Sequence, residues 1–165
     1  MILNAYAKLN LGLRVVRKRD DGYHDLHTVF QQIDIHDTLS FEKIKSDVNI
    51  TSDQSDLPLD HNNLVYKAFM LLKDKYRLCG GLKVHIKKVI PSGAGLGGGS
   101  SNAAITLFAT NHLWQLEIQK QTLMDLAAEI GSDVPFFLQS GTALGEGRGE
   151  ILTPLPNLDG IWIVL

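Results

Sequence analysis

The sequence predicts an α+β fold, and three observations support this prediction. The first fifty residues have the alternating apolar pattern of strands, and the apolar residues after position 62 recur mostly at the spacing of a helix face. Between a predicted strand and a predicted helix lies a glycine-rich stretch, Pro91–Ala104. With 165 residues, 44% of them hydrophobic and 21% charged, the chain is long enough to form one substantial core.

The N-terminal region is predicted to form strands separated by turns. Ile2–Ala7 and Leu11–Val16 alternate in apolar character, and Lys8 and Asn10 separate them. Because a lysine in a strand usually faces water, the pattern alone favours an outward-facing Lys8 over a charge directed at an anion. Further strands are predicted at His27–Ile35, Thr38–Ile44 and Val48–Thr51, followed by a polar loop at Ser52–His61.

A charged hairpin is predicted at Arg17–His24, after the second strand. Its Asp21-Gly22 pair is a strong turn signal. Tyr23 and His24 follow the turn, and two interpretations of them remain open. They are compatible with ordinary packing at a strand edge, and equally with a flat stacking surface and a polar neighbour for a heterocycle.

A helix and a strand are predicted before the glycine-rich stretch. Apolar residues within Asn63–Tyr76 lie on one helical face, with Asn62 or Asn63 as the N-cap. The strand Leu82–Ile90 carries Lys88 towards the glycines. Surface lysines are common, so Lys88 is only a weak candidate ligand.

The last third of the chain is predicted to combine helices with short strands. One helix begins at Ser100, and another spans Gln121–Ile130. Asp133 lies in the irregular segment Gly131–Pro135, where an aspartate is usually a turn former or a cap. Short strands are predicted at Phe136–Gln139, Thr142–Leu144, Ile151–Leu152 and Ile161–Leu165, with a structural turn at Gly145–Gly149. Because proteins rarely end on an apolar strand without a partner, we expect the chain to be a fragment.

The glycine-rich stretch is best explained as a phosphate-binding loop. Residues 93–99 contain five glycines, which offer no side chains to a core and would present backbone N–H groups at the start of a helix. A flexible linker is a weaker interpretation, because linkers seldom lie directly between a strand and an alanine-rich helix.

Three other classes of glycine-rich nucleotide loop do not fit. Gly93-x-Gly95-x-x-Gly98 matches the dinucleotide pattern, but Glu117, about twenty residues further on, follows a helix and not a second hydrophobic strand. A Walker loop ends in Gly-Lys-Ser or Gly-Lys-Thr, whereas here Gly99 is followed by two serines. The His-Arg-Asp and Asp-Phe-Gly sequences of protein kinases do not occur.

Composition argues against several kinds of partner. The formal net charge is −2, and no basic stripe with interleaved aromatic residues occurs, so nucleic acid is not an expected partner. Cys79 is the single cysteine and cannot build a disulfide framework, and the six histidines lack the spacing of a zinc site. Residues 89–116 are uncharged but rich in glycine and polar groups, so no membrane span is expected. Residues 1–16 lack the features of a secretory signal, which predicts a cytoplasmic protein.

Four motifs occur in an order that resembles one family of small-molecule kinases. Residues 91–101 resemble the ATP loop of the GHMP kinases, Pro-x-x-x-Gly-Leu-Gly-Ser/Gly-Ser-Ser. Together with Ala7–Leu11, Asp21–His24 and Gly131–Pro135, this loop resembles the 4-diphosphocytidyl-2-C-methyl-D-erythritol kinases within that superfamily. The resemblance implies a GHMP kinase N-terminal domain, a mixed, largely antiparallel sheet backed by helices with a left-handed βαβ unit.

The resemblance also implies an activity and its cofactors. Enzymes of this family use ATP and Mg²⁺ to phosphorylate the 2-hydroxyl of their cytidyl substrate in the non-mevalonate isoprenoid pathway. Asp133 would be the catalytic aspartate, and Lys8 its partner near the transferred phosphoryl group. Because a carboxylate is a weak base towards an alcohol, we expect Asp133 mainly to orient the hydroxyl and to accept its proton late.

The same resemblance implies binding residues for both substrates. Tyr23 would stack on the cytosine and His24 would hydrogen-bond its edge, while Asn10 would lie nearer the reacting end. The adenine pocket maps to Asn63 and Leu64, with Lys88 close by. The residues assigned to the ATP phosphates are Pro91, Gly93, Ala94, Gly95, Leu96, Gly97, Gly98, Gly99, Ser100 and Ser101, with Ser100 or Ser101 as a candidate Mg²⁺ ligand.

In such an enzyme a C-terminal domain supplies the second wall of the active site. We therefore expect residues 1–165 to be the ATP-binding domain, ending where the second domain starts, and to be weakly active or inactive on their own. Two alternatives remain open: another GHMP kinase, and a nucleotide-binding domain without transferase activity. The sequence predicts no oligomeric state.

Overall fold

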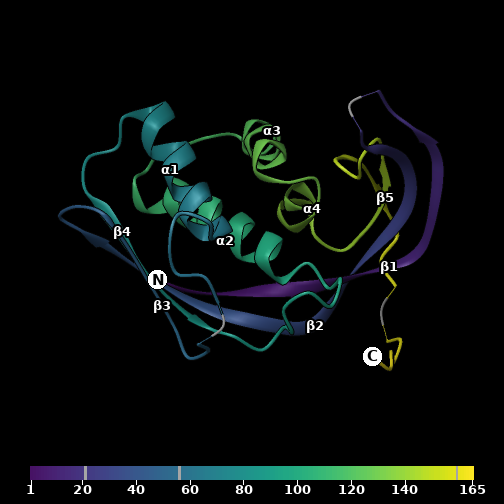
Figure 1. Ribbon diagram of the computed structural model, residues 1–165, viewed down its shortest axis with the longest axis horizontal. Coiled ribbons are helices and arrows are strands. Elements are labelled where there is room, and N and C mark those ends of the chain that lie inside the picture. The colour runs from purple at the N-terminus through teal and green to yellow at the C-terminus, as the bar shows by residue number, and fades with distance from the viewer. Residues whose placement is uncertain (21, 56, 159) are drawn as a thin grey trace.

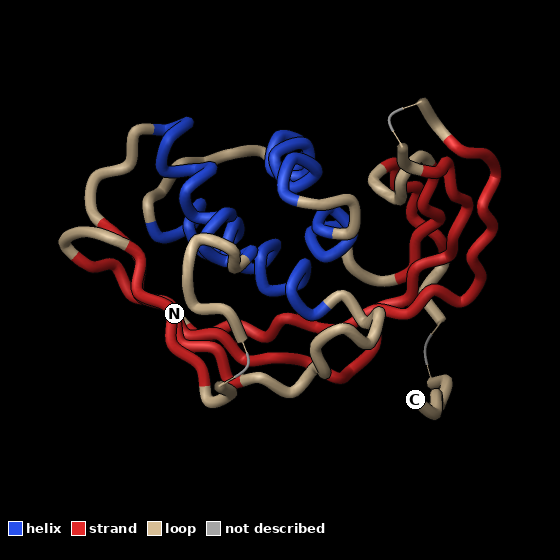
Figure 2. Tube along the Cα trace, viewed as in Figure 1, coloured by secondary structure: helices blue, strands red, loops and turns tan. Residues whose placement is uncertain are grey.

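The computed structural model describes residues 1–165 except residues 21, 56 and 159. The helices gather on one face of a curved sheet, which bends upwards at the end where β1, β2 and β5 run together (Figure 1). Figure 2 separates these layers by colour, with the helices in blue above the strands in red. The predicted α+β class is confirmed.

The sheet is organised around β2. The strands are β1 (Ile2–Lys18), β2 (His24–Ile44), β3 (Val48–Ser52), β4 (Gly81–Lys87), β5 (Thr142–Glu146) and β6 (Ile151–Leu155). Along one edge β2 pairs with β1, and along the other it pairs with β5 and then β4. These pairs and β5–β6 are antiparallel, whereas β3 and β4 are parallel and are joined through α1 into a βαβ unit. The sheet is therefore mixed and largely antiparallel, as predicted.

Two of the predicted strand breaks are wrong, because the chain continues as one strand through each. The predicted strands on either side of Lys8 and Asn10 both belong to β1, and the break predicted before Thr38 lies inside β2. β-Bulges absorb the irregularity, since the pairing register shifts at Tyr6/Ala7, Asn10/Gly12 and Val15/Arg17. A polar residue does not end a strand whose backbone stays paired.

The turn between β1 and β2 is only partly described. Gly22 has a φ of 85° and donates its N–H to the carbonyl oxygen of Arg19 at 3.2 Å, as expected for a turn glycine. Asp21, the other residue of the predicted Asp-Gly pair, lies outside the described residues.

The predicted helices form with small shifts in their ends. They are α1 (Leu64–Tyr76), α2 (Gly98–Leu113) and α3 (Lys120–Ile130), and a fourth helix that was not predicted, α4, spans Val134–Gln139. Asn63 caps α1 as predicted, because its Oδ1 accepts the N–H of Val65 at 2.9 Å. Helix α2 begins at Gly98 and not at Ser100, so the last glycines of the loop form its first turn.

Helix α4 replaces a predicted strand at Phe136–Gln139, and that prediction is wrong. Pro135 lies in the first turn of the helix, where its missing N–H removes no helical hydrogen bond. Phe136 and Phe137 are buried in the core from this helix. A short apolar run is compatible with either a buried strand or a buried helix, so periodicity alone could not distinguish them.

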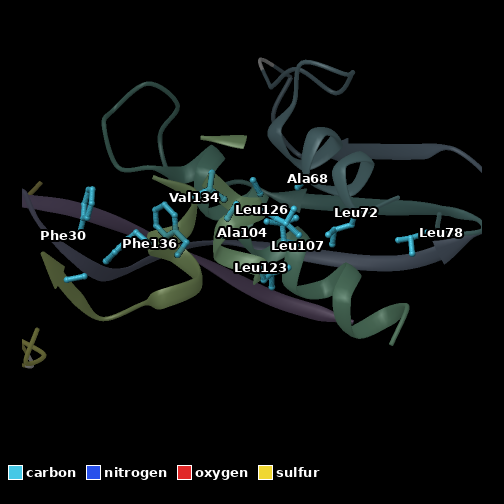
Figure 3. Packing of buried hydrophobic residues seen from close by; sticks show 14 residues of the cluster. Phe30, Ala68, Leu72, Leu78, Ala104, Leu107, Leu123, Leu126, Val134 and Phe136 are labelled. Carbon is cyan, nitrogen blue, oxygen red and sulfur yellow. The ribbon is translucent and has the colours of Figure 1, made fainter. Parts of the chain in front are cut away.

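The largest core cluster lies between the helices and the upturned end of the sheet. In Figure 3, Phe30 of β2 and Phe136 of α4 lie at one end of this cluster and Leu78 at the other. Leu107 of α2 belongs to it, while Ala109 of the same helix packs in a second cluster with the sheet and α1. Because α2 joins both clusters, its N-terminus is fixed relative to β1 and β2.

The C-terminal region agrees with the predictions in part. Strands β5 and β6 confirm the predicted strands at Thr142–Leu144 and Ile151–Leu152. The glycine-rich turn has the expected structural role, since a Cβ on Gly145 would lie only 2.6 Å from the Phe30 ring. The strand predicted at Ile161–Leu165 is wrong: the described residues 160–165 form no strand, and Trp162 is 98% exposed.

Candidate functional site

The glycine-rich loop connects β4 to α2 and forms the wall of an open pocket of about 380 Å³. The residues that line this pocket are Leu57, Leu64, Lys88, residues 91–100 and Asp133. The structure thus places the loop, Leu64, Lys88 and Asp133 around one space. Of the residues assigned to ATP from the sequence, Asn63 and Ser101 do not line it.

The backbone of the loop is arranged as a phosphate-binding loop requires. Gly93, Gly95 and Gly97 have φ values of 73°, 75° and 72°, a region that residues with a side chain rarely adopt. Gly97 occupies the N-cap position of α2, so no side chain caps the first turn of this helix. The N–H groups of that turn have no partners within the helix and can donate to an anion.

The end of the loop packs tightly against β1 and α4. The N–H of Lys8 donates to the carbonyl oxygen of Leu96 at 3.0 Å. A Cβ on Gly97 would lie 2.6 Å from Cζ of Phe137 and 3.2 Å from Cγ of Lys8. Only glycine fits this position, and the loop is therefore fixed directly beside Lys8.

Lys8 and Asp133 form an ion pair at this position. Lys8 Nζ lies 3.3 Å from Oδ2 of Asp133 and donates to Oδ1 of Asn10 at 2.5 Å. The ammonium also lies 5.1 Å from the centroid of the Phe30 ring. Lys8 is only 5% exposed, so the expectation of an outward-facing side chain is wrong. These partners compensate for burial of the charge.

Asp133 is held at the start of α4 with its carboxylate partly open to solvent. It occupies the N-cap position of that helix, but its side chain makes no capping hydrogen bond and instead faces Lys8. The side chain is 32% exposed and contributes to the pocket lining. One carboxylate therefore borders both the lysine and the space in front of the loop.

A short hydrogen-bond chain orients Asn10 towards Lys8. Asn10 Nδ2 donates to the hydroxyl of Thr28 at 2.7 Å, and that hydroxyl donates to the carbonyl oxygen of Gly12 at 2.8 Å. The amide oxygen of Asn10 is thereby left to accept from the Lys8 ammonium. Thr28 was not predicted from the sequence, where it is one threonine among many in a strand.

Two residues assigned to the nucleotide have other partners. The Asn63 side chain caps α1 and also donates from Nδ2 to the carbonyl oxygen of Pro58 at 2.6 Å. Lys88 is buried, and its Nζ lies 3.0 Å from Oδ2 of Asp37. The N–H of Lys88 donates to Asp53 at 2.9 Å, and this bond holds the pKa of the Asp53 carboxyl below its usual value.

The residues near the pocket can contribute oxygen ligands to Mg²⁺ but cannot enclose it. Ser100 lines the pocket, and the buried hydroxyl of Ser101 has no hydrogen-bond partner among the described residues. In the described part of the chain no three His, Cys, Asp or Glu side chains cluster as a metal site. Mg²⁺ usually takes one or two protein oxygens, together with substrate phosphates and water, and this donor set fits that pattern.

Tyr23 and His24 lie at the tip of the hairpin formed by β1 and β2. Tyr23 is 56% exposed, and the guanidinium carbon of Arg148 lies 5.0 Å from the centroid of its ring. His24 pairs in the strand register with Lys18 and is exposed. Tyr23 and His24 therefore lie at one end of the β1–β2 pair, apart from Lys8 in β1 and from its partner Asp133 at the start of α4.

The turn between β5 and β6 lies between the hairpin tip with Tyr23 and the ion pair of Lys8 with Asp133. Its Arg148 contacts Tyr23, while a Cβ on its Gly149 would lie 3.3 Å from Phe30 and 3.8 Å from Oδ1 of Asp133. The turn that the sequence indicated as purely structural therefore borders both sets of predicted site residues. Nothing in its glycine pattern distinguished it from an ordinary hairpin turn.

None of the helices in the described part of the chain is long and apolar enough to cross a membrane.

Comparisons with known proteins agree with this geometry. Residues 63–141 match the family described as the GHMP kinases N terminal domain. The 4-diphosphocytidyl-2-C-methyl-D-erythritol kinase of Lachnospira eligens is 48% identical over 157 residues, which are 94% of this chain and 54% of that protein. The kinase of the same name from Enterococcus faecalis is 45% identical, over 100% of this chain and 59% of that protein.

Solved structures give the same result. A crystal structure of 4-(cytidine 5'-diphospho)-2C-methyl-D-erythritol kinase matches with a TM-score of 0.81 and 42% identity, over 94% of this chain and 55% of that one. The mevalonate kinase of Methanococcus jannaschii shares the fold, with a TM-score of 0.69 at 16% identity over 95% of this chain and 56% of that one. The chain spans between half and three fifths of the length of the curated relatives it matches. It belongs to the GHMP kinases and corresponds to the N-terminal portion of the 4-diphosphocytidyl-2-C-methyl-D-erythritol kinases.

Proposed function

We propose that the complete protein, meaning this chain extended to the length of its relatives, phosphorylates the 2-hydroxyl of 4-diphosphocytidyl-2-C-methyl-D-erythritol with ATP. One observation carries the proposal. The Lys8–Asp133 ion pair borders the pocket whose wall is the glycine-rich loop. Asp133 would supply a carboxylate to the acceptor alcohol, and Lys8 would supply a cation to the transferred phosphoryl group. Both lie beside the loop that would bind the donor phosphates.

The loop and α2 would hold the triphosphate. The left-handed glycines leave the loop backbone without side chains in front of the pocket, so that its N–H groups would donate to the phosphates, and the uncapped N-terminus of α2 would add its positive dipole end. Ser100 and Ser101 are the proposed oxygen ligands for Mg²⁺, which when bound would neutralise charge on the donor phosphates.

Asp133 and Lys8 would act on the acceptor. With Lys8 beside it, Asp133 is held so that one carboxylate oxygen can orient the acceptor hydroxyl and receive its proton as the new bond forms. The ammonium of Lys8 would stabilise charge on the transferred phosphoryl group. Phe30, Asn10 and the backbone bond to Leu96 keep this ammonium in place.

The cytidyl group would bind near the hairpin tip. Tyr23 offers an exposed ring for stacking, and Arg148 packs on that ring. His24 would hydrogen-bond the base edge, and Asn10 would lie closer to the reacting hydroxyl. On the donor side, Leu64 presents an apolar wall for adenine, with Lys88 beside it, whereas the Asn63 amide is already bonded and would contribute indirectly.

The remaining proposals concern the whole enzyme. Residues 1–165 would be its ATP-binding domain, and the further length present in the relatives would complete the active site. The partners would be ATP, Mg²⁺ and a soluble cytidyl substrate, without nucleic acid or membrane. We place the enzyme in the cytoplasm, where ATP is available.

Replacement of Asp133 by asparagine in the complete protein tests the function. Asp133→Asn keeps the shape of the side chain but removes the proton acceptor, so kcat should fall by about 10²-fold or more while the KM values for ATP and the acceptor change little. Asp125→Asn on α3 is a suitable control, because the Asp125 carboxylate is exposed and accepts a hydrogen bond from Gln121 of the same helix.

Steady-state kinetics with the cytidyl substrate would decide between the alternatives. A near-normal kcat in Asp133→Asn would exclude Asp133 from the reaction. ATP binding that shows no turnover and no dependence on cytidine nucleotides would instead identify a nucleotide-binding domain without transferase activity. Turnover of another alcohol in preference to the cytidyl substrate would indicate a different GHMP kinase.

A further inference from the structure

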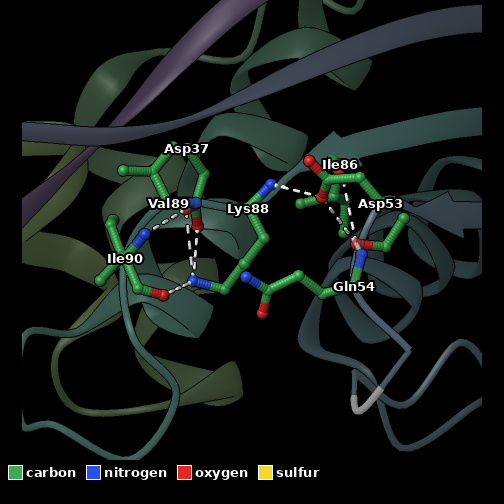
Figure 4. A network of polar contacts seen from close by, with 8 residues as sticks. Asp37, Asp53, Gln54, Ile86, Lys88, Val89 and Ile90 are labelled. Carbon is green, nitrogen blue, oxygen red and sulfur yellow. Dashed lines mark hydrogen bonds and ion pairs between the residues drawn. The ribbon is translucent and has the colours of Figure 1, made fainter.

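A buried ion pair between β2 and the end of β4 has no part in the proposed chemistry. Asp37 is fully buried, and Lys88 is 7% exposed. Lys88 Nζ lies 3.0 Å from Oδ2 and 3.3 Å from Oδ1 of Asp37. Figure 4 shows the Lys88 side chain directed at the Asp37 carboxylate. A buried carboxylate and a buried ammonium are each costly unless paired, so each holds the other in place.

Asp37 also accepts hydrogen bonds from the backbone that leads into the loop. Its Oδ1 accepts the N–H of Val89 at 2.7 Å and the N–H of Ile90 at 2.8 Å. Lys88 Nζ in turn donates to the carbonyl oxygen of Ile90 (Figure 4). One aspartate therefore anchors both the lysine and the two residues that precede Pro91.

These bonds explain where β4 ends. The strand was predicted to continue to Ile90, but its pairing with β2 stops at Lys87, opposite Thr38. From that point the N–H of Lys88 turns to Asp53, and the next two amides turn to Asp37. Carboxylates thus replace the strand partner over the last three residues before the loop, and they set the direction in which the loop leaves the sheet.

The pair also sets the position of a charge beneath the loop. A Cβ on Gly98 would lie 3.1 Å from Lys88 Nζ, so the ammonium lies directly under the first turn of α2. Lys88 is the one cationic side chain among the described residues that line the pocket. Movement of this ammonium would therefore change both the packing and the electrostatic potential at the phosphate position.

We propose that Asp37 is a positioning residue of the nucleotide site. It acts through Lys88 and through the amides of Val89 and Ile90, and it holds the glycine-rich loop and the ammonium beneath it in the arrangement that receives a nucleoside triphosphate. Asp37 itself touches neither the nucleotide nor the acceptor. The inference rests on the proposed function only in requiring that the pocket bind ATP.

Asp37→Asn in the complete protein tests the inference. The asparagine oxygen can still accept from the two amides, but its neutral group no longer balances Lys88, so the ammonium is left unpaired and shifts under Gly98. We expect the KM for ATP to rise by about tenfold, with kcat at saturating ATP and the KM for the acceptor within about twofold of wild type.

A matched pair on the same two strands provides the control. Glu42 of β2 and Lys83 of β4 face each other across the register and form an exposed ion pair at 3.3 Å. Glu42→Gln removes one charge from an exposed ion pair between the same two strands and should leave the KM for ATP unchanged. A purely structural role for Asp37 would lower the folded fraction and hence the apparent kcat, but not the affinity of the folded enzyme for ATP.

A second variant covers the case in which Asp37→Asn does not fold. Asp37→Glu keeps the charge that balances Lys88, so it should fold. Its longer side chain cannot keep Lys88 and the two amides in the same positions, so it should raise the KM for ATP and speed amide hydrogen exchange at Val89 and Ile90. Unchanged ATP affinity together with unchanged exchange in this variant would overturn the proposal. ATP titration does not depend on the acceptor, so a wrong acceptor would leave this test intact, whereas a wild-type protein that binds no ATP would overturn both proposals.

Discussion

Gly93 and Gly97 share a backbone conformation but differ in what a side chain would meet. Their φ values are 73° and 72°. A Cβ on Gly93 would have nothing within 4 Å, whereas one on Gly97 would collide with Phe137 and press on Lys8. The two positions therefore separate the conformational requirement for glycine from the requirement for close packing.

We expect Gly97→Ala to be much more damaging than Gly93→Ala. Both variants place an alanine in the left-handed region, at a cost of about 1–2 kcal/mol. Gly97→Ala adds overpacking of about 1–3 kcal/mol and displaces Lys8 and the loop end, so ATP binding should weaken as well. Urea unfolding and ATP titration of both variants check this, and equal effects would show that backbone conformation alone explains the glycines.

The charged residues of the site show what alternation could and could not predict. Asp37, Leu39 and Phe41 are alternate residues of β2 and are all buried. Lys88, just after β4, has the same alternation with buried Val84 and Ile86. A polar residue at an inward position was visible in the sequence and could have indicated a buried pair. The preference of strand lysines for water misled the expectation for Lys8, because two of its partners, Asp133 and Phe30, come from distant parts of the chain.

At the scale of elements, boundaries with a local sequence signal were predictable, and boundaries set by distant side chains were not. The boundaries of α1 and α3 follow from apolar spacing and, for α1, from the Asn63 cap. The end of β4 depends on side chains from β2 and from the loop after β3, which no local pattern contains. Helix α4 lies where a strand was predicted. The prediction was wrong because this apolar run is too short to show whether its period is that of a helix or a strand.

The bond from Lys88 to Asp53 makes the end of β4 sensitive to acid. This backbone hydrogen bond keeps the pKa of Asp53 below its usual value, so the folded state favours the ionised carboxylate. The resulting stabilisation is present above the unfolded pKa of about 3.9 and is lost as the pH falls through the lower folded value.

We therefore expect the stability difference between wild type and Asp53→Asn to depend on pH. Wild type should be the more stable at pH 6, and the difference should shrink steadily as the pH falls below about 4. Thermal unfolding of both proteins between these conditions measures the effect. A difference that stays constant with pH would mean that the ionised carboxylate contributes nothing through this bond.

At the scale of the whole molecule, two ion pairs hold the two ends of one loop. Asp37 and Lys88 fix the chain as it leaves β4, and Lys8 with Asp133 lies where the loop joins α2. The sheet links both pairs, because Lys8 and Asp37 lie on the paired strands β1 and β2. The family resemblance implied a site role for three of these four residues, Lys8, Lys88 and Asp133, but only the folded chain shows that the two pairs lie at opposite ends of the loop.

The proposed donor and acceptor sites differ in how much of each lies in this chain. The pocket around the loop is lined by Leu64, Lys88 and Asp133 in addition to the loop itself. The proposed base-binding Tyr23 is 56% exposed, and the relatives continue well beyond the region that this chain matches. The loop proposed to hold the donor phosphates therefore borders a pocket formed within residues 1–165, whereas the proposed acceptor site would gain a second wall in the longer protein.

We expect the 165-residue chain to bind ATP yet transfer its phosphoryl group at less than about 1% of the rate of the complete protein. Without the second domain, the acceptor would be neither aligned with the γ-phosphate nor shielded from water. Kinases accelerate phosphoryl transfer largely by such alignment, so the rate should fall. Calorimetric titration with ATP and turnover of the cytidyl substrate should be measured on both proteins. Gly97→Ala serves as the control that weakens ATP binding in each. Turnover by the short chain at about 1–100 per second, the range of ordinary kinases, would mean that residues 1–165 already contain the whole acceptor site.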